Sequence, residues 1–101
     1  MGATGEERVL RLLRRAGLGP RRVPRSQSPA SRAEYADLIC GPFLIEEKET
    51  AQRTIPLAEW FEKLRREAGR MAKLPLIWVS HPDIGDVVIL DADAMIKLLK
   101  G

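Results

Sequence analysis

The stretch "DLICGPFLIEEK", residues 37–48, constrains the fold more than any other part of the 101-residue sequence. Two short apolar runs flank Gly41 and Pro42, a dipeptide typical of chain reversals, so the stretch predicts a β-hairpin. A hairpin centred on this dipeptide pairs Ile39 with Leu44. Because proline fits the second position of a tight two-residue turn poorly, we expect a somewhat longer loop.

The ends of this hairpin carry charges that an apolar strand pair does not need. The same register places Asp37 opposite Glu46, and strand alternation puts Lys48 on the face of Glu46 while Glu47 points to the other side. Two carboxylates across a ladder repel each other unless a cation lies between them. Hard oxygen ligands suit Mg²⁺ or Mn²⁺, and a neighbouring ammonium can hold a water or stabilise charge on a phosphate. A metal, two acids and an amine on one strand-end face make a phosphodiester-cleaving centre, although by spacing alone an ordinary surface cluster of ion pairs is the more common origin of such a pattern.

A third acid comes from the amphipathic helix expected over residues 4–16. Glu6 lies three and four residues before Val9 and Leu10, so it belongs to the core-facing stripe of that helix. Glu7 falls on the outer side, near Arg11. We therefore expect Glu6 to reach the end of the sheet and join the metal shell, the alternative being a charge that complements the helix dipole.

The rest of the chain alternates helical and strand patterns. This order predicts an α/β fold, a small mixed β-sheet flanked by helices, in a single domain over residues 1–101. We assign Trp60 and Phe61 to the core. The elements expected besides the hairpin and the first helix are a short edge strand at 21–24, a helix at 56–73, strands at 74–80 and 86–90, and a last helix capped by Asp91 or Asp93.

Charge is distributed unevenly along the sequence. Lysine and arginine number 17 against 14 acids, for a net charge of +3, and arginine dominates the first third. Residues 25–35 read as a mobile basic loop rich in Ser, Arg and Pro. Arginine forks match phosphate oxygens in two-point contacts, so the bias favours binding of a nucleic-acid backbone, although a solvated helix face is the simpler interpretation.

Other features limit the possible chemistry. The single cysteine, Cys40, excludes an internal disulfide and a multi-cysteine metal site, and its apolar surroundings predict a buried, inert thiol. His81 precedes a proline in a turn, where we expect it to be exposed and without a chemical role. No stretch is long and apolar enough for a membrane span, so we expect a soluble intracellular protein.

With these motifs in view, the chain resembles the PD-(D/E)XK nuclease superfamily, and within it the archaeal-type Holliday-junction resolvases and their phage relatives. That pattern is a helix glutamate, a basic Ser/Gly loop, an aspartate opening a hairpin, and Glu-x-Lys on its second strand. The corresponding segments are "GEERVLRLL" with Glu6, "RRVPRSQS", "ADLI" and "LIEEK". The likeness runs over most of the chain, and residues 6–48 carry its specific motifs.

The resemblance implies a role for each matching residue. Asp37 and Glu46 would bind Mg²⁺, with the backbone carbonyl of Glu47 as a further ligand and Glu6 in the inner or outer shell. Lys48 would position the attacking water. The residues expected to contact DNA are Arg22, Arg25, Ser26, Ser28 and Arg32.

The implied function is a Mg²⁺-dependent endonuclease, with Mn²⁺ as a substitute ion, that resolves four-way DNA junctions as a homodimer. Its setting would be the cytoplasm of a prokaryotic cell or of a phage-infected host. Symmetric resolution needs two active sites, and we expect the dimer to form largely through residues 74–100. The alternatives are a less selective nuclease of the same superfamily, for repair or phage DNA processing, and a non-catalytic nucleic-acid-binding module.

Overall fold

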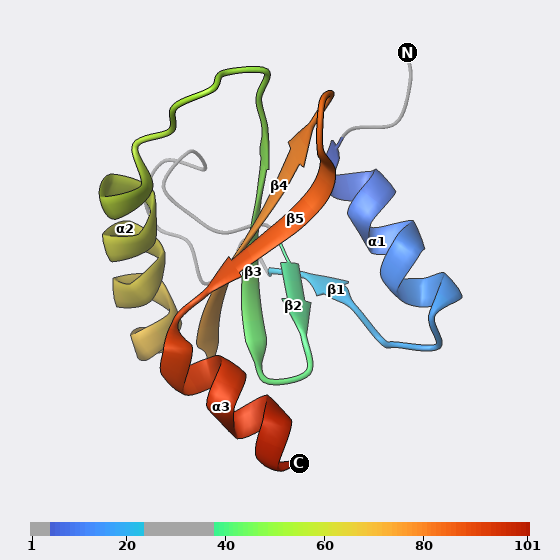
Figure 1. Ribbon diagram of the computed structural model, residues 1–101. Helices are drawn as coiled ribbons and strands as arrows, with labels where there is room; N and C mark the ends of the chain where they lie inside the picture. Colours follow the sequence, from blue (N-terminus) through green and yellow to red (C-terminus); the bar gives the residue numbers. More distant parts are fainter. Residues whose placement is uncertain (1–4, 24–37) are drawn as a thin grey trace.

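A computed structural model describes residues 5–23 and 38–101, and within them three helices surround a five-stranded sheet (Figure 1). The sheet is mixed, because β3 and β4 run parallel while every other neighbouring pair is antiparallel. This confirms the expected α/β class. In spatial order the strands are β1 (Arg21–Arg22), β2 (Leu38–Cys40), β3 (Phe43–Glu49), β4 (Leu74–His81) and β5 (Gly85–Leu90).

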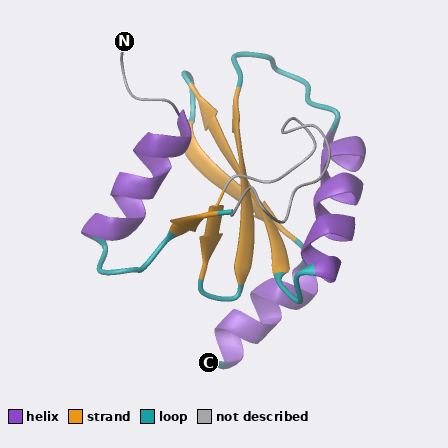
Figure 2. Cartoon of the chain, turned by 180° about the vertical axis from the view of Figure 1, so that it is seen from behind, coloured by secondary structure: helices purple, strands orange, loops and turns teal. Residues whose placement is uncertain are grey.

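Helices α1 (Gly5–Arg15) and α2 (Leu57–Arg70) cover opposite faces of this sheet, as Figure 2 shows from behind. Val9 and Leu10 of α1 pack on one face, and Leu64 and Ala68 of α2 pack on the other. Strand side chains alternate between the two clusters. The central strand β3 is therefore covered on both sides. The α1 cluster also contains Leu38, Cys40, Ile45 and Leu76, and the α2 cluster Ile39, Leu44, Ile77 and Val79.

The β2–β3 hairpin has the predicted register, with Ile39 opposite Leu44. The expected longer loop is wrong, because Cys40 pairs with Phe43 and only Gly41 and Pro42 lie between them. Gly41 has a φ of 56°, the left-handed value that the first position of a type II′ turn requires. The second position of that turn has a negative φ, which proline accepts.

Both long helices end in a residue with positive φ. At the end of α1, Gly17 has a φ of 85° and the Leu18 amide donates to the Leu13 carbonyl at 3.1 Å. Helix α2 ends at Arg70 and not at 73 as expected, since Ala72 adopts a φ of 54° and the next amide bonds back to the helix. Alanine is not a usual residue for this conformation, so the pattern did not indicate the stop.

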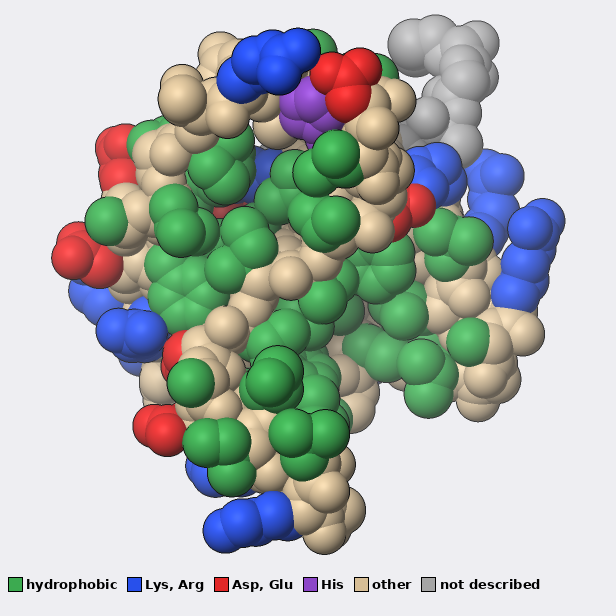
Figure 3. All heavy atoms as spheres, in the orientation of Figure 1, with side chains coloured by type: hydrophobic (Ala, Val, Ile, Leu, Met, Phe, Trp, Pro, Cys, Tyr) green, Lys and Arg blue, Asp and Glu red, His purple; other side chains and the backbone are tan. Residues whose placement is uncertain are grey.

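Helix α3 (Ala92–Lys100) begins at Asp91, whose side chain accepts a hydrogen bond from the Ala94 amide at 3.0 Å. Of the two caps considered, Asp91 is therefore the one used. Ala94 is the buried residue of this helix, and its other apolar side chains are exposed. They continue a hydrophobic area that spreads over β5 and α3 in Figure 3. Among the described helices, none has both the length and the apolar character to cross a bilayer.

A polar network joins α1 to the far edge of the sheet. Arg8 donates two hydrogen bonds to the Asp86 carboxylate on β5, one of them at 2.9 Å. The same carboxylate accepts from the Trp78 indole at 3.1 Å and from the Ser80 hydroxyl at 2.8 Å. Chiefly through the Arg8 hydrogen bond, the pKa of Asp86 is held well below its usual range. The network therefore ties a helix to a strand 78 residues away in sequence.

We expect Asp86→Asn to lower the free energy of unfolding at pH 7 by about 1 kcal/mol, since the charge-assisted bonds are partly exposed to solvent. Because the folded pKa of Asp86 lies below the unfolded value of about 3.9, its stabilisation is complete above that pH. It is lost as the pH falls through the folded value. Urea unfolding from pH 7 to pH 2 measures the difference between the two proteins.

Asp83→Asn serves as the control, because Asp83 is an exposed acid in the turn between the same two strands. The stability difference between wild type and Asp86→Asn should narrow below about pH 4. A difference that stays constant across the whole pH range would show that the carboxylate charge does not stabilise the fold.

Candidate active site

Glu46 and Lys48 lie on the α2 face of the central strand, as alternation along β3 predicts. The Glu46 side chain is 9% exposed and that of Lys48 is 32% exposed. Their register partners on β4 are Ile77 and Val79, both members of the buried α2 cluster. A carboxylate and an ammonium have thus been placed against an apolar core, where each charge needs a partner.

The Lys48 amine has two neighbours at this position. Its nitrogen lies 3.6 Å from the Glu46 Oε2 atom and 4.9 Å from the centre of the Trp60 ring on α2. The first distance is that of an ion pair, and the second is within the range of a cation–π contact. Trp60 is half-buried and packs against the α2 cluster, as expected of a core residue, but the sequence did not indicate its contact with Lys48.

Glu47 occupies the opposite face of the sheet, as expected. There it lies close to the first turn of α1, where a Cβ atom at Gly5 would collide with the Glu47 carboxylate. The glycine therefore permits the helix to begin beside this acid. Since Glu46 and Glu47 point to opposite faces, their side chains do not converge on one ion, and only the Glu47 backbone remains a candidate ligand.

Of the predicted metal ligands, Glu46 has the chemistry that a hard divalent cation prefers. Glu46 presents carboxylate oxygens whose ion-pair partner among the described residues is Lys48, at a distance longer than a direct hydrogen bond. Asp37, the second predicted ligand, lies outside the described residues. Within residues 5–23 and 38–101, no three acidic, histidine or cysteine side chains gather as a metal cluster. Metal binding therefore stays a prediction.

Glu6 has a strong partner in the structure. Its Oε1 accepts a hydrogen bond from the Arg22 Nε at 2.7 Å, and another nitrogen of the same guanidinium lies 3.8 Å from Glu7. Glu7 also pairs with Arg11 at 3.9 Å, as expected for the outer side of the helix. The structure thus places Glu6 between α1 and the edge strand β1, and its place in a metal shell stays a prediction.

The predicted DNA contacts fall mostly on residues that the structure does not describe. Arg22 is exposed on β1 and forms the ion pairs with the two helix glutamates. Arg25, Ser26, Ser28 and Arg32, together with the expected mobile loop at 25–35, lie outside the described residues. Arg11, Arg14, Arg15 and Arg21 are exposed on α1 and β1.

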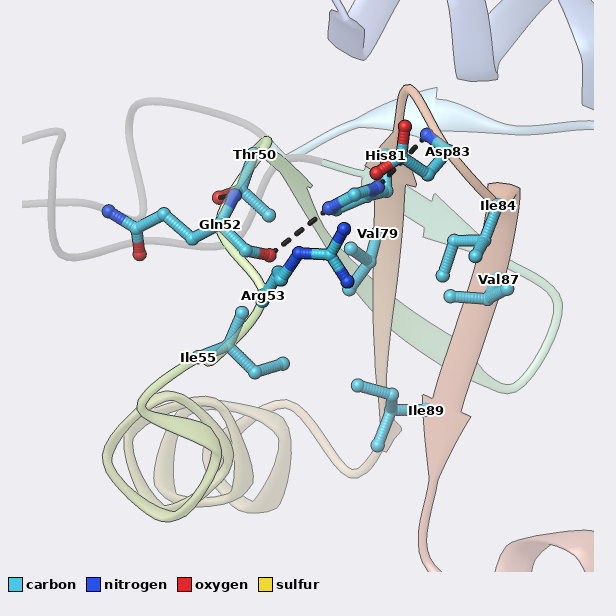
Figure 4. A pocket seen from close by; sticks show the side chains of 10 residues that line it. All are labelled: Thr50, Gln52, Arg53, Ile55, Val79, His81, Asp83, Ile84, Val87 and Ile89. Atoms are coloured by element: carbon cyan, nitrogen blue, oxygen red, sulfur yellow. Dashed lines mark hydrogen bonds between the residues drawn. The ribbon is translucent and has the colours of Figure 1, made fainter.

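A cavity of about 300 Å³ lies beyond Val79 on the same sheet face as Lys48 (Figure 4). Val87 and Ile89 of the edge strand β5 line it, and Arg53 and His81 stand at its border. His81 is less exposed than expected. It is half-buried, because one ring nitrogen lies 3.1 Å from the Gln52 carbonyl and the other accepts a hydrogen bond from the Asp83 amide.

Two contacts, one on each face of the sheet, could not be inferred from sequence spacing. The Lys48–Trp60 pair joins a strand to a helix, and the Arg8–Asp86 pair joins elements at opposite ends of the chain. Arg8 stood out only as one of many arginines in the first third. The one available signal for Trp60 was its place on the apolar face of a helix that follows the charged strand.

The sequence matches no family model and no curated protein. Among solved structures, it is similar to Hjc from Archaeoglobus fulgidus, a Holliday junction resolvase from an archaeal hyperthermophile. The match covers 84% of this chain and 72% of that one, with a TM-score of 0.65 and 22% identity. At this identity the likeness shows the fold. The chain therefore shares its α/β fold with that resolvase, as the resemblance implied.

We expect opposite effects on Mn²⁺ binding from the two members of the ion pair. Glu46→Gln should weaken binding about 10-fold or more, because a carboxylate ligand is lost. Lys48→Met should strengthen it, since the ammonium no longer competes for the Glu46 oxygens. Isothermal titration calorimetry with Mn²⁺ measures both changes.

Glu49→Gln is the matched control for this titration, because Glu49 is an exposed acid of the same strand. Its affinity for Mn²⁺ should equal that of the wild type. If Glu46→Gln binds Mn²⁺ as tightly as the control does, Glu46 is not a metal ligand.

Proposed function

We propose that this chain is a Mg²⁺-dependent DNA endonuclease that resolves four-way junctions by hydrolysing phosphodiester bonds. One observation carries the proposal: Glu46 and Lys48 lie 3.6 Å apart on the buried central strand of a fold shared with a Holliday junction resolvase. Charged side chains on a strand covered on both faces cost free energy of folding unless they are partnered. Their presence there is expected if they act on a substrate.

The acids have the role of metal ligands in this proposal. Glu46 and Asp37 would hold Mg²⁺ or Mn²⁺, with the Glu47 carbonyl as a further ligand and Glu6 in an outer position. When bound, the ion supplies Lewis acidity toward a phosphate oxygen. The buried position of Glu46 strengthens its attraction for a cation, because few waters compete for the carboxylate.

Lys48 has the role of the charge-stabilising and water-holding group. Its ammonium can donate hydrogen bonds to a water or to a phosphate oxygen on which negative charge develops. The side chain is one-third exposed, so the amine is accessible while its stem packs along the strand. In the structure the amine lies 3.6 Å from an oxygen of the acid that would bind the metal.

The DNA backbone is the proposed partner of the arginine-rich first third. Arg22 lies on β1, and Arg25, Ser26, Ser28 and Arg32 follow it in sequence. Arginine contacts to phosphate fix the position of the duplex without reading its sequence. Residues 1–101 would then act as one nuclease domain, with DNA bound along the segment that precedes the catalytic hairpin.

The β5 and α3 surface is the proposed dimer interface. Two cuts on opposing strands require two copies of a chain that carries one catalytic strand. The edge of β5 has no strand partner in the described sheet, and Met95, Ile96, Leu98 and Leu99 of α3 are each about half exposed or more. Burying this surface against a second copy would keep Lys48, which lies under α2, free in both subunits.

We expect the wild type to cleave a labelled four-way junction in the presence of Mg²⁺ and not in EDTA, and to cleave a matched linear duplex more slowly. Lys48→Ala should reduce the cleavage rate by about 10²-fold or more, while affinity for the junction changes little. Single-turnover cleavage and fluorescence anisotropy measure the two quantities. Arg70→Ala, which removes an exposed cation of α2, serves as the control.

Each outcome distinguishes between the candidate functions. Equal cleavage of junction and duplex would favour a less selective nuclease. Tight DNA binding without Mg²⁺-dependent cleavage would favour a non-catalytic binding module. A parallel loss of affinity and cleavage in Lys48→Ala would make Lys48 an ordinary phosphate contact.

We expect the wild type to be a dimer at micromolar concentration, with an interface burying about 1,200 Å² or more. The double change Ile96→Asp and Leu99→Asp should give a monomer, because it places two charges in an apolar interface. Light scattering measures the mass. Leu18→Asp, which alters an exposed leucine after α1, should leave the dimer intact, whereas a wild type that stays monomeric would contradict this interface.

A further inference from the structure

The Lys48 amine is held by Glu46 on one side and by the Trp60 ring on the other. The two distances are 3.6 Å to the carboxylate oxygen and 4.9 Å to the ring centre. Trp60 belongs to α2, whereas the charged pair belongs to β3. The indole is half-buried and packed against the cluster that contains Leu64 and Val79, so its position is fixed by the core.

Glu46 alone does not fix the amine. A direct hydrogen bond between an ammonium and a carboxylate measures about 2.7–2.9 Å, and the observed separation is longer. Lysine also has a flexible four-carbon stem, so an ion pair at this distance leaves several side-chain conformations open. The ring adds a second attraction, because the face of an indole is the best aromatic partner for a cation.

The role of the ring increases once a divalent cation occupies Glu46. The Glu46 carboxylate would then be neutralised and the Lys48 ammonium would face a like charge, so the ion pair between Glu46 and Lys48 would weaken. The attraction of the Trp60 ring for the ammonium does not depend on the charge of Glu46. Among the residues described here, Trp60 is therefore the group that can retain the amine over the active site.

We infer that Trp60 is a positioning residue, which holds the Lys48 amine beside the scissile phosphate while Glu46 binds the metal. The inference rests on the proposed nuclease function. Without the ring, the amine would either move closer to Glu46 or turn toward solvent. Both movements would displace the amine from the position where it can hold a water or stabilise charge. The cleavage rate should therefore fall, while the affinity for DNA should not change.

The chain contains a matched control on the same helix. Phe61, the next residue, packs against the same cluster and has the Arg65 guanidinium 5.0 Å from its ring centre. Phe61→Leu therefore removes a half-buried aromatic ring and a cation–π contact, as Trp60→Leu does. Only the change at Trp60 involves an amine next to the proposed metal ligand.

A spectroscopic measurement tests the contact without using activity. In the wild type, the ring current of Trp60 should shift the Lys48 Cε protons upfield in the NMR spectrum. The shift should disappear in Trp60→Leu, persist in part in Trp60→Phe, and stay unchanged in Phe61→Leu. A Lys48 signal that is the same in wild type and Trp60→Leu would overturn the inference.

Single-turnover cleavage of a four-way junction with Mg²⁺ tests the consequence. We expect Trp60→Leu to cleave about 10-fold more slowly or worse, with junction affinity within about 2-fold of the wild type. Trp60→Phe should recover most of the rate, and Phe61→Leu should cleave as the wild type does. Trp60→Phe also covers the case in which Trp60→Leu fails to fold.

Two negative results have different meanings. The positioning role would be overturned if the wild type is active and Trp60→Leu cleaves at the same rate. It would also be overturned if Trp60→Leu and Phe61→Leu lose the same factor in cleavage rate. Either result would leave the nuclease proposal standing. A wild type that cleaves none of the DNA substrates with Mg²⁺ or Mn²⁺ would overturn the proposed function, and the inference with it.

Discussion

The double coverage of β3 is the constraint on which the rest of the structure depends. This strand is central in the sheet, with α1 on one face and α2 on the other, so most of its side chains are buried or half-buried. The first half of the strand carries apolar residues such as Leu44 and Ile45, which pack in the two buried clusters. In its second half it carries Glu46, Glu47 and Lys48, and each of these must find a partner within the protein. The layout of the candidate site follows from the partners they find.

Much of this arrangement could be predicted from local patterns. The hairpin register follows from the two apolar runs, because a slip by one residue would turn every core side chain outward. The assignment of Glu46 and Lys48 to one face, and Glu47 to the other, needs only the alternation of a strand. The expected end of the first helix at residue 16 lies one residue beyond Arg15, where α1 ends, and Gly17 accepts the positive φ that follows the helix.

Other features depended on interactions that spacing does not encode. The two-residue turn has a positive φ at Gly41, which makes it a type II′ turn. The second position of this turn type has a negative φ and therefore accepts proline, which was not anticipated from the sequence. Ala72 ends α2 in a conformation that alanine rarely adopts, so composition indicated a longer helix. Trp60 and Lys48 meet only because the β3–α2–β4 crossover folds the helix back over its own preceding strand. Such a contact is set by tertiary packing, and one sequence alone does not reveal it.

Lys48 lies between two glutamates in the sequence of β3. This charge order favours the native register of β3 against β4 over registers that are shifted by one residue. The charged part of the strand reads Glu46, Glu47, Lys48, Glu49. A shift of the strand by one residue in either direction would place a glutamate where Lys48 now lies, under the Trp60 ring. The face of an aromatic ring carries negative potential, so it attracts an ammonium and repels a carboxylate. The charge order thus opposes both nearest misalignments at the end of the strand where the hydrophobic pattern has already stopped.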